Sequence, residues 1–384
     1  MDHEKINRLR DYLEEYNLDA LIVRNPENVL YVSGYWPITG WSLAIVNRDG
    51  ELSLIVPKSE LEYVDNSIKD IKVLPGESLV DVWQPYKLIK EKLREIDLGE
   101  KPRIGVEMSF ETMATNNVVG ELNYASLPSF NLFKEVWNAE LIDATDILYE
   151  LRKVKTEKEI EKMKIANEIA AKGLEAGREK LKEDMTEAEL ASIIEHVIHS
   201  EGIGYKGVKR ARGFAFVMSG VNGSKAYYPY NISSDKKIKR GETILIELNV
   251  YADGYWTDIT RTWCIGSPKQ MYQDIRDILI AAQEEVYRNF KEGMSAKEVD
   301  ALARNFIRNT KYAKLFPHRL GHGIGVRIHE PPALHPASVE KMKVNVTHTV
   351  EPGMYGKDFG IRYEDVVKDQ KKGVEVLTKI DKDL

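Results

Sequence analysis

The sequence is poor in cysteine and lacks a long apolar run. Its 384 residues contain a single cysteine, Cys264, which cannot form a disulfide within the chain and agrees with a reducing compartment. No segment reaches the roughly 18 consecutive apolar residues of a membrane-spanning helix. The first residues, MDHEKINRLRDYLEEYNLD, also lack the apolar core of a signal peptide. We therefore expect a soluble cytoplasmic protein with no membrane partner.

An excess of positive charge is absent as well. The chain has 55 Lys and Arg against 61 Asp and Glu, a formal net charge of −6, and its basic clusters are as short as KGVKRAR and KDQKKG. Nucleic-acid-binding proteins usually concentrate basic residues in a stripe on a chain that is basic overall. The composition thus predicts no nucleic-acid partner.

Two domains are expected from the length, because single domains typically hold about 100–200 residues. Residues 1–148 mix short strands and helices, with a turn at Asn25-Pro26 and a helix within 111–124, which predicts an α/β domain. Residues 149–384 alternate long amphipathic helices with hairpins, which predicts an α+β domain. The expected helices cover 157–181, 187–201, 269–291 and 296–310, and three of them follow capping-box pairs, Thr156 with Glu159, Thr186 with Glu189 and Ser295 with Glu298.

A β-hairpin is predicted for TILIELNVYADGYWTDITRTWCIG, residues 243–266, which alternates apolar and polar residues around a central Asp-Gly pair typical of a type I′ turn. A hairpin centred on that pair places Glu247 opposite Thr260 and Asn249 opposite Asp258, all on one face. Glu247 and Asp258 would then be diagonal neighbours, roughly 7–8 Å apart at the backbone, and could reach one cation. The alternative is a solvated face that carries two unrelated acids.

Two further acids lie in HTVEPGMYGKDFGIRYEDVV, which predicts a second hairpin-like unit. Glu351 precedes a Pro-Gly turn and Glu364 follows GIRY, both among apolar strand residues. Acids in such surroundings are costly unless they are paired or bind metal. With Glu247, Asp258 and His322 they form a set suited to two divalent first-row metal ions such as Mn, Co, Fe or Zn. Two such ions can hold a bridging hydroxide nucleophile and polarise a carbonyl oxygen.

Two histidines, His322 and His329, stand in the segment GHGIGVRIHEPP. Its glycines and prolines disfavour a helix, and a regular strand would point the two rings to opposite faces. A loop or a bulge is therefore needed if both rings are to face one cavity. The alternative is a pair of structural histidines in a turn.

In this order, the motifs GYWTDITRT, GHGIGVRIHEPP, TVEPGMY and GIRYEDVV resemble the pita-bread metallopeptidase family, which includes Xaa-Pro dipeptidases (prolidases), Xaa-Pro aminopeptidases and the metal-free creatinases. LDALIVRNPENVLYVSGY is similar to the family's N-terminal domain, so the resemblance covers nearly the whole chain. It implies a pita-bread α+β domain over 149–384, preceded by a smaller creatinase-type α/β domain over 1–148. It also implies a metal-dependent exopeptidase that cleaves the Xaa-Pro bond of dipeptides or short peptides with a metal-bound hydroxide, and a homodimer in which one subunit's N-terminal domain lies near the other's active site.

The resemblance further implies roles for individual residues. Asp258, His322, Glu351 and Glu364 fall on metal-ligand positions, with Asp258 and Glu364 bridging two ions, for which Mn or Co is expected. Glu351 would also orient the attacking water and carry its proton. His329 would contact the substrate or the tetrahedral intermediate.

Two positions depart from the family pattern. Glu247 stands where the family usually has Asp, and its extra methylene moves the ligand oxygens by about 1 Å or more, so the second ion is expected to bind more weakly. SGVNGSKAYYPYN carries tyrosines where the family has a substrate-binding His, so the candidates for substrate contact besides His329 are Tyr227, Tyr228, Tyr230 and Arg362. Two alternatives to a peptidase remain: a creatinase-like hydrolase of small amides, and a non-catalytic pita-bread binding protein.

Overall fold

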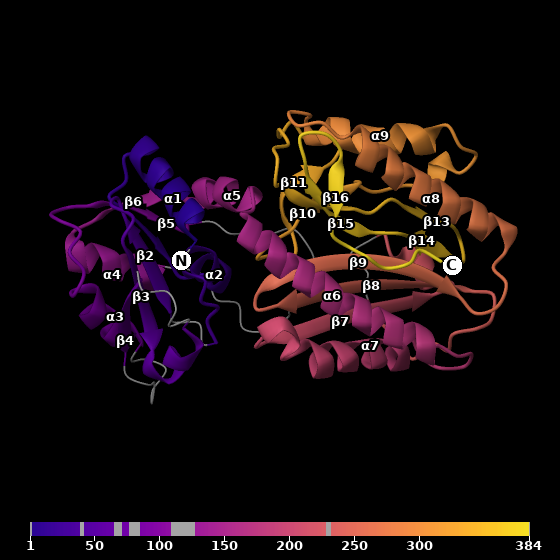
Figure 1. Ribbon diagram of the computed structural model, residues 1–384, viewed down its shortest axis with the longest axis horizontal. Helices are drawn as coiled ribbons and strands as arrows, with labels where there is room; N and C mark the ends of the chain where they lie inside the picture. The colour runs from indigo at the N-terminus through magenta and orange to yellow at the C-terminus, as the bar shows by residue number, and fades with distance from the viewer. Residues whose placement is uncertain are drawn as a thin grey trace. The chain divides into compact units, whose positions relative to one another are not determined.

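The computed structural model describes residues 2–38, 42–64, 71–76, 85–108, 127–227 and 232–383. The chain forms two compact units, Met1–Arg152 and Lys153–Leu384 (Figure 1). Among the described residues, no helix is both long enough and apolar enough to cross a membrane. The helix expected within 111–124 and the candidates Tyr228 and Tyr230 lie outside the described residues.

The first unit is built on a mixed six-stranded sheet in the order β4-β3-β2-β1-β5-β6. Apolar residues cover both of its faces: along β1, Leu21 and Val23 join one buried cluster, and Ala20 and Ile22 join the other. The elements are α1 (His3–Glu15), β1 (Ala20–Val23), α2 (Pro26–Ser33), β2 (Leu43–Asn47), β3 (Leu52–Pro57), η1 (Lys58–Tyr63), β4 (Ile71–Gly76), α3 (Pro85–Leu93), β5 (Arg103–Val106), α4 (Leu127–Trp137), β6 (Glu140–Asp143) and α5 (Thr145–Lys153).

Helix α2 follows Asn25, where the sequence predicts only a turn at Asn25-Pro26, so that prediction is incomplete. Pro26 occupies the first turn of the helix, where its missing N–H would have no intrahelical partner in any case. Gly34 ends the helix with a left-handed φ of 76°. The eight-residue helix is short and almost wholly buried, so it shows little of the polar–apolar period by which helices are recognised.

Glu107 is a buried acid at the end of β5 in this unit, only 2% exposed. Its carboxyl group accepts hydrogen bonds from the Arg24 backbone N–H at 2.8 Å, the Asn25 backbone N–H at 3.1 Å and Asn28 Nδ2 at 2.7 Å. Burial nevertheless raises the pKa of Glu107 to about 7, against the opposing effect of these donors. Glu107 therefore titrates in the physiological range.

The second unit combines antiparallel strands with long helices. The helices expected in the sequence are confirmed, and the capping boxes at Thr156, Thr186 and Ser295 are formed. Its elements are α6 (Glu157–Lys180), α7 (Glu187–Gly202), η2 (Tyr205–Gly207), β7 (Ala211–Ser219), η3 (Gly223–Lys225), β8 (Thr243–Ala252), β9 (Tyr255–Cys264), α8 (Gln270–Asn289), α9 (Ala296–Arg308), η4 (Ala313–Leu315), β10 (Gly321–Gly323), β11 (Glu330–Leu334), β12 (Thr347–Val350), β13 (Gly353–Tyr355), β14 (Gly360–Arg362), β15 (Asp365–Asp369) and β16 (Val374–Val376).

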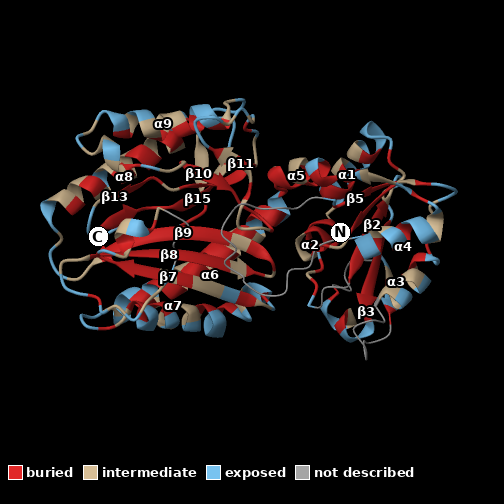
Figure 2. Cartoon of the chain, turned by 180° about the vertical axis from the view of Figure 1, so that it is seen from behind, coloured by how far each residue is buried: buried red, intermediate tan, exposed pale blue. Residues whose placement is uncertain are grey.

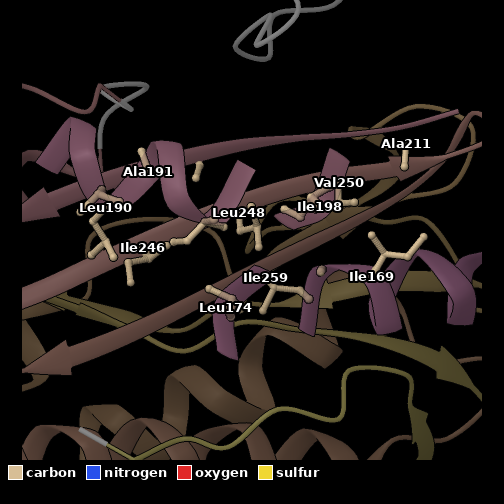
Figure 3. Close-up of a cluster of buried hydrophobic side chains, with 14 of the residues drawn as sticks. Ile169, Leu174, Leu190, Ala191, Ile198, Ala211, Ile246, Leu248, Val250 and Ile259 are labelled. Carbon is tan, nitrogen blue, oxygen red and sulfur yellow. The ribbon is translucent and has the colours of Figure 1, made fainter. Parts of the chain in front are cut away.

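Strands β7, β8 and β9 form an antiparallel sheet, and α6 and α7 cover one of its faces (Figure 1). The face under the helices is apolar: Ile246, Leu248 and Ile259 pack with Leu174 of α6 and Ile198 of α7 (Figure 3). Both β8 and β9 are buried along nearly their whole length (Figure 2). The other face must therefore also be covered, although it carries polar side chains.

The predicted hairpin register is confirmed in β8 and β9. Glu247 pairs with Thr260 and Asn249 with Asp258. Both turn residues have positive φ, 46° for the Asp and 85° for the Gly, as a type I′ turn requires. These four side chains therefore share the face of the sheet that points away from α6 and α7.

The second hairpin-like unit is two short ladders in series. β13 pairs with β14, and the chain on either side continues into β12 and β15, which also pair antiparallel. One register runs through both ladders, with Val350 opposite Asp365 and Gly353 opposite Arg362. Glu351 and Glu364 therefore lie opposite each other where the pairing is interrupted, which brings the two carboxylates to one place.

A pH-dependent stability is expected from Glu107. The free Glu side chain titrates near 4.3, so the folded chain binds more protons than the unfolded chain between about pH 4 and pH 7, and stability falls as pH rises through this window. The loss from Glu107 should be roughly 3 kcal/mol, from the shift of its pKa to about 7. Glu107→Gln mimics the protonated acid and should remove this part of the slope. Urea unfolding of both proteins at pH 5 and pH 8 measures it, and an unaltered slope in the variant would contradict the expectation.

Candidate metal centre

Separate strands of the second unit bring acids and an imidazole to one buried place. Asp258 of β9, His322 of β10 and Glu364, between β14 and β15, are 2%, 3% and 1% exposed. His322 Nε2 lies 3.6 Å from both Asp258 Oδ2 and Glu351 Oε1. Thr260 Oγ1 donates a hydrogen bond to Glu364 Oε2 at 2.6 Å. Residues separated by about a hundred positions thus share one cluster.

The ring orientation of His322 leaves one nitrogen facing the acids. Nδ1 lies 3.0 Å from the Gly323 carbonyl oxygen, and because a carbonyl only accepts, Nδ1 carries the ring hydrogen. Burial, together with the neighbouring His329, keeps the pKa of His322 well below its usual value, so the ring is neutral. The lone pair of Nε2 therefore points toward Asp258 and Glu351, the arrangement of a metal-binding imidazole.

The three carboxyl groups oppose one another's ionisation. Burial, followed by the charges of Glu364 and Glu351, raises the pKa of Asp258 well above its usual value. Burial and then Glu364 raise the pKa of Glu351, and burial raises that of Glu364. Without a cation between them, these acids hold protons in the folded chain.

Glu247 lies beside the cluster, paired with Arg362. Both residues are buried, at 8% and 5% exposure. Arg362 Nε also donates to Thr260 Oγ1 at 2.9 Å, and its Nη1 donates to the Tyr355 hydroxyl at 3.2 Å. The sequence predicts Glu247 as a metal ligand and Arg362 as a substrate contact, but it does not predict their pairing. The guanidinium would compete with a metal ion for the Glu247 carboxylate.

Two residues of the site were missed, although both lie on the predicted polar face of the hairpin. Asn249 is fully buried, and its Nδ2 donates to Asp258 Oδ1 at 2.7 Å. Thr260 donates to Glu364 and accepts from Arg362. The predicted hairpin register could have identified both residues, since Asn249 faces Asp258 and Thr260 faces Glu247. Because Asn249 donates to Asp258 Oδ1, the other carboxylate oxygen, Oδ2, is the one that lies near His322.

His329 lies against His322, with ring centroids 4.1 Å apart. The irregularity expected between the two histidines is confirmed, because the pairing of β10 with β11 shifts between His322 and Gly323. Burial, followed by the charge of Arg319, lowers the pKa of His329 to about 4. Its Nδ1 is buried and has no hydrogen-bond partner among the residues that the structure describes. His329 is therefore a neutral imidazole at the edge of the cluster.

Tyr227 lines a hollow of about 350 Å³ beyond Arg362. Its ring lies 5.4 Å from that of Tyr355, whose hydroxyl group contacts Arg362 and, at 3.1 Å, His318 Nε2. Tyr227 and Arg362 thus lie on one side of the cluster, while Tyr230 is outside the described residues. The hollow is lined by Ser224, Lys225, Tyr227, Lys314, Leu315, Pro317, Tyr355, Gly356 and Lys357.

The donor atoms fit divalent cations. Three sets of residues each bring ligand atoms within 4.8 Å of one another: Glu247, Asp258 and Glu364; His322, Glu351 and Glu364; and Asp258, His322 and His329. Glu364 Oε1 is buried and has no hydrogen-bond partner within the described part of the chain. Carboxylate oxygens and an imidazole Nε2 suit first-row divalent ions, and such an ion would offset the repulsion among the acids.

Comparisons with known proteins identify relatives of both units. The chain matches the sequence model of Metallopeptidase family M24 over residues 161–368 and that of the Creatinase/Prolidase N-terminal domain over residues 5–154. It is 32% identical over 382 residues to an Xaa-Pro dipeptidase of Pyrococcus furiosus, and the match covers 99% of each chain.

Two solved structures resemble the whole chain. An Xaa-Pro dipeptidase from Bacillus anthracis superposes with a TM-score of 0.80 at 26% identity, covering 100% of this chain and 99% of that one. An X-Pro aminopeptidase from Thermotoga maritima gives a TM-score of 0.77 at 28% identity, covering 99% and 98%. The expected pita-bread domain, preceded by a creatinase-type domain, is confirmed. The chain belongs to Metallopeptidase family M24.

Proposed function

We propose that this protein is a metal-dependent exopeptidase that hydrolyses the bond between the first residue and proline in dipeptides or short peptides. The observation that supports it most is the buried cluster of Asp258, His322, Glu351 and Glu364 around the free Nε2 of His322. A non-catalytic protein would gain nothing from acids whose burial and mutual repulsion work against folding. The Xaa-Pro dipeptidase of Pyrococcus furiosus supports the choice of substrate.

Two ion positions follow from the overlap of the donor sets. His322, Glu351 and Glu364 would hold one ion, and Glu247, Asp258 and Glu364 the other, so Glu364 would bridge them, and Asp258, 3.6 Å from His322 Nε2, would bridge as well. The second ion would bind more weakly, because Arg362 competes for Glu247. Bound divalent ions would supply an activated water and polarise the scissile carbonyl group.

The remaining residues would position the substrate and move protons. Glu351 would orient the attacking water and carry its proton, a role suited to a carboxyl group whose pKa is raised by burial and by Glu364. His329 would donate a hydrogen bond to the tetrahedral intermediate. Arg362 and Tyr227, on the side of the 350 Å³ hollow, would contact the proline end of the substrate, as would Tyr230.

Other features stay predictions and belong to the same proposal. The metal would be Mn or Co, the protein would be cytoplasmic and homodimeric, and residues 1–148 and 149–384 would be its functional domains. In the dimer, the N-terminal domain of one subunit would restrict the other's active site to short peptides. Sedimentation velocity at micromolar concentration tests the dimer.

The direct test of activity is hydrolysis of Ala-Pro, Leu-Pro and Phe-Pro by the purified protein. We expect cleavage with added Mn²⁺ or Co²⁺, and loss of cleavage after chelation that is reversed when the metal is restored. Glu351→Gln is the matched negative control, since it keeps the shape of the side chain and removes its charge. No cleavage of any Xaa-Pro peptide under metal-saturating conditions would contradict the proposal.

Substitutions at the two histidines separate their roles. His322→Ala should lower metal content and activity together, because His322 supplies a ligand atom. His329→Ala should leave metal content near that of the wild type and lower kcat by about 10²–10³-fold, the scale for losing one donor to a tetrahedral intermediate. Elemental analysis with steady-state kinetics measures both. Since His329 also lies within reach of Asp258 and His322, equal metal loss in the two variants would show that it is a ligand instead.

Metal removal should change how stability depends on pH. In the metal-free chain, the raised pKa values of Asp258, Glu351 and Glu364 mean that the folded state holds more protons than the unfolded state above about pH 4, so stability falls as pH rises. A fixed Mn²⁺ concentration, about 100 times the Kd at pH 8, should add roughly 3 kcal/mol at that pH, or about 5–10 °C in Tm. The same concentration should add less at pH 5, where protons compete for the carboxylates and weaken metal binding.

Calorimetry with and without Mn²⁺ checks this expectation. The measurement is best made in the Glu107→Gln background, because Glu107 contributes a pH dependence of the same sign. Asp258→Asn should lose most of the metal-dependent gain. A gain in Tm that is equal at both pH values would contradict competition between protons and metal for these carboxylates.

A further inference from the structure

Three aromatic rings lie on the same face of the β7-β8-β9 sheet as Asp258. Phe214, Tyr251 and Trp256, here called the aromatic patch, are all half-buried. Tyr251 is paired directly with Trp256, edge to face, with centroids 5.1 Å apart, and Phe214 stacks on Trp256 at 6.1 Å. The rings therefore form one continuous, partly accessible aromatic surface rather than three separate core residues.

The strand register places this patch directly beside the candidate metal centre. Trp256 precedes Asp258 by two residues on β9, and Tyr251 follows Asn249 by two on β8, so both share the face of the metal ligands. Phe214 of β7 is paired with Asn249, which itself donates to Asp258. Residues two apart on a strand are roughly 7 Å apart, so a molecule held at Asp258 and His322 is within reach of the rings.

Arg362 and three lysines lie on the side of the cluster away from the aromatic patch. Moving away from the turn along β8 and β9, the aromatic patch is followed by Asn249 and Asp258, then by Glu247 and Thr260 with Arg362. Beyond Arg362 lies the hollow lined by Lys225, Lys314 and Lys357. The site therefore has an aromatic end and a basic end, with the metal ligands between them.

This polarity orients a dipeptide. In Xaa-Pro, the free carboxylate belongs to the proline and suits the basic end, which leaves the side chain of the first residue at the aromatic end. We propose that Phe214, Tyr251 and Trp256 bind that side chain and make the enzyme prefer peptides whose first residue is aromatic or large and apolar. The proposal rests on the Xaa-Pro activity proposed above.

Basic side chains should be disfavoured at the same place. Arg210 and Arg212 lie close enough to the Tyr251 hydroxyl group to lower its pKa, although burial, the larger effect, raises it. Their positive charges would repel a Lys or Arg as the first residue of the substrate. The aromatic patch should therefore select the first residue of the substrate by shape, and the two arginines should select it by charge.

The test compares kcat/KM for Phe-Pro, Ala-Pro and Lys-Pro. We expect the wild type to prefer Phe-Pro over Ala-Pro by about tenfold or more and to cleave Lys-Pro least, in line with the scale of discrimination in apolar pockets. Trp256→Ala and Phe214→Leu should each lower kcat/KM for Phe-Pro far more than for Ala-Pro, mainly through KM. Tyr205→Ala, which truncates a half-buried ring on the helix-covered side of the same sheet, is the control and should keep the preference of the wild type.

A binding measurement separates this proposal from the proposed activity. Calorimetric titration of Glu351→Gln with Phe-Pro and with Ala-Pro reports affinity without turnover. Tighter binding of Phe-Pro that disappears in Glu351→Gln/Trp256→Ala supports the aromatic patch even if the wild type cleaves neither peptide. Equal affinities for the two dipeptides, or a preference that survives both patch substitutions in correctly folded protein, would overturn it, whatever the cleavage assay shows.

Discussion

The repulsion among Asp258, Glu351 and Glu364 is the constraint on which the catalytic unit depends. Three acids in a place that is almost free of solvent raise one another's pKa values, so the metal-free fold tolerates them only by holding protons. His322 adds a neutral imidazole whose free nitrogen faces two of them. A divalent cation would relieve the repulsion and use that nitrogen, so the same residues that weaken the empty fold would favour the occupied one.

The fold meets this constraint by placing acids at defined points of paired strands. The type I′ turn sets the register of β8 and β9 and so fixes Asp258 opposite Asn249. The ladders β12–β15 and β13–β14 share one register and leave Glu351 and Glu364 at the interruption between them. Apolar packing of α6 and α7 on the far face of the sheet holds the first of these elements in place (Figure 3). Positions on strands are more rigid than positions on loops, which suits a site that depends on distances between charges.

The parts of the site that could be predicted from sequence follow short-range rules. The Asp-Gly turn and the alternating pattern determine which residues of the hairpin face each other, and the glycines of GHGIGVRIHEPP predict the irregular backbone that brings His322 and His329 together. The pairing of Glu247 with Arg362 could not be predicted, because it depends on how two long side chains from separate strands pack. Helix α2 was missed because burial removes its polar face. The predicted register places Asn249 opposite Asp258, but nothing in the sequence indicates the hydrogen bond between them.

The most direct test of a metal-stabilised carboxylate cluster is anomalous X-ray diffraction from crystals saturated with Mn²⁺. We expect an anomalous peak at about 2.0–2.6 Å from His322 Nε2 and from the carboxylate oxygens of Glu351 and Glu364, with a weaker second peak between Asp258 and Glu247. Such peaks would show that the repelling acids are held together by cations. The absence of any peak at these residues in a crystal saturated with Mn²⁺, while Asp258, Glu351 and Glu364 keep their positions, would contradict a metal-stabilised cluster.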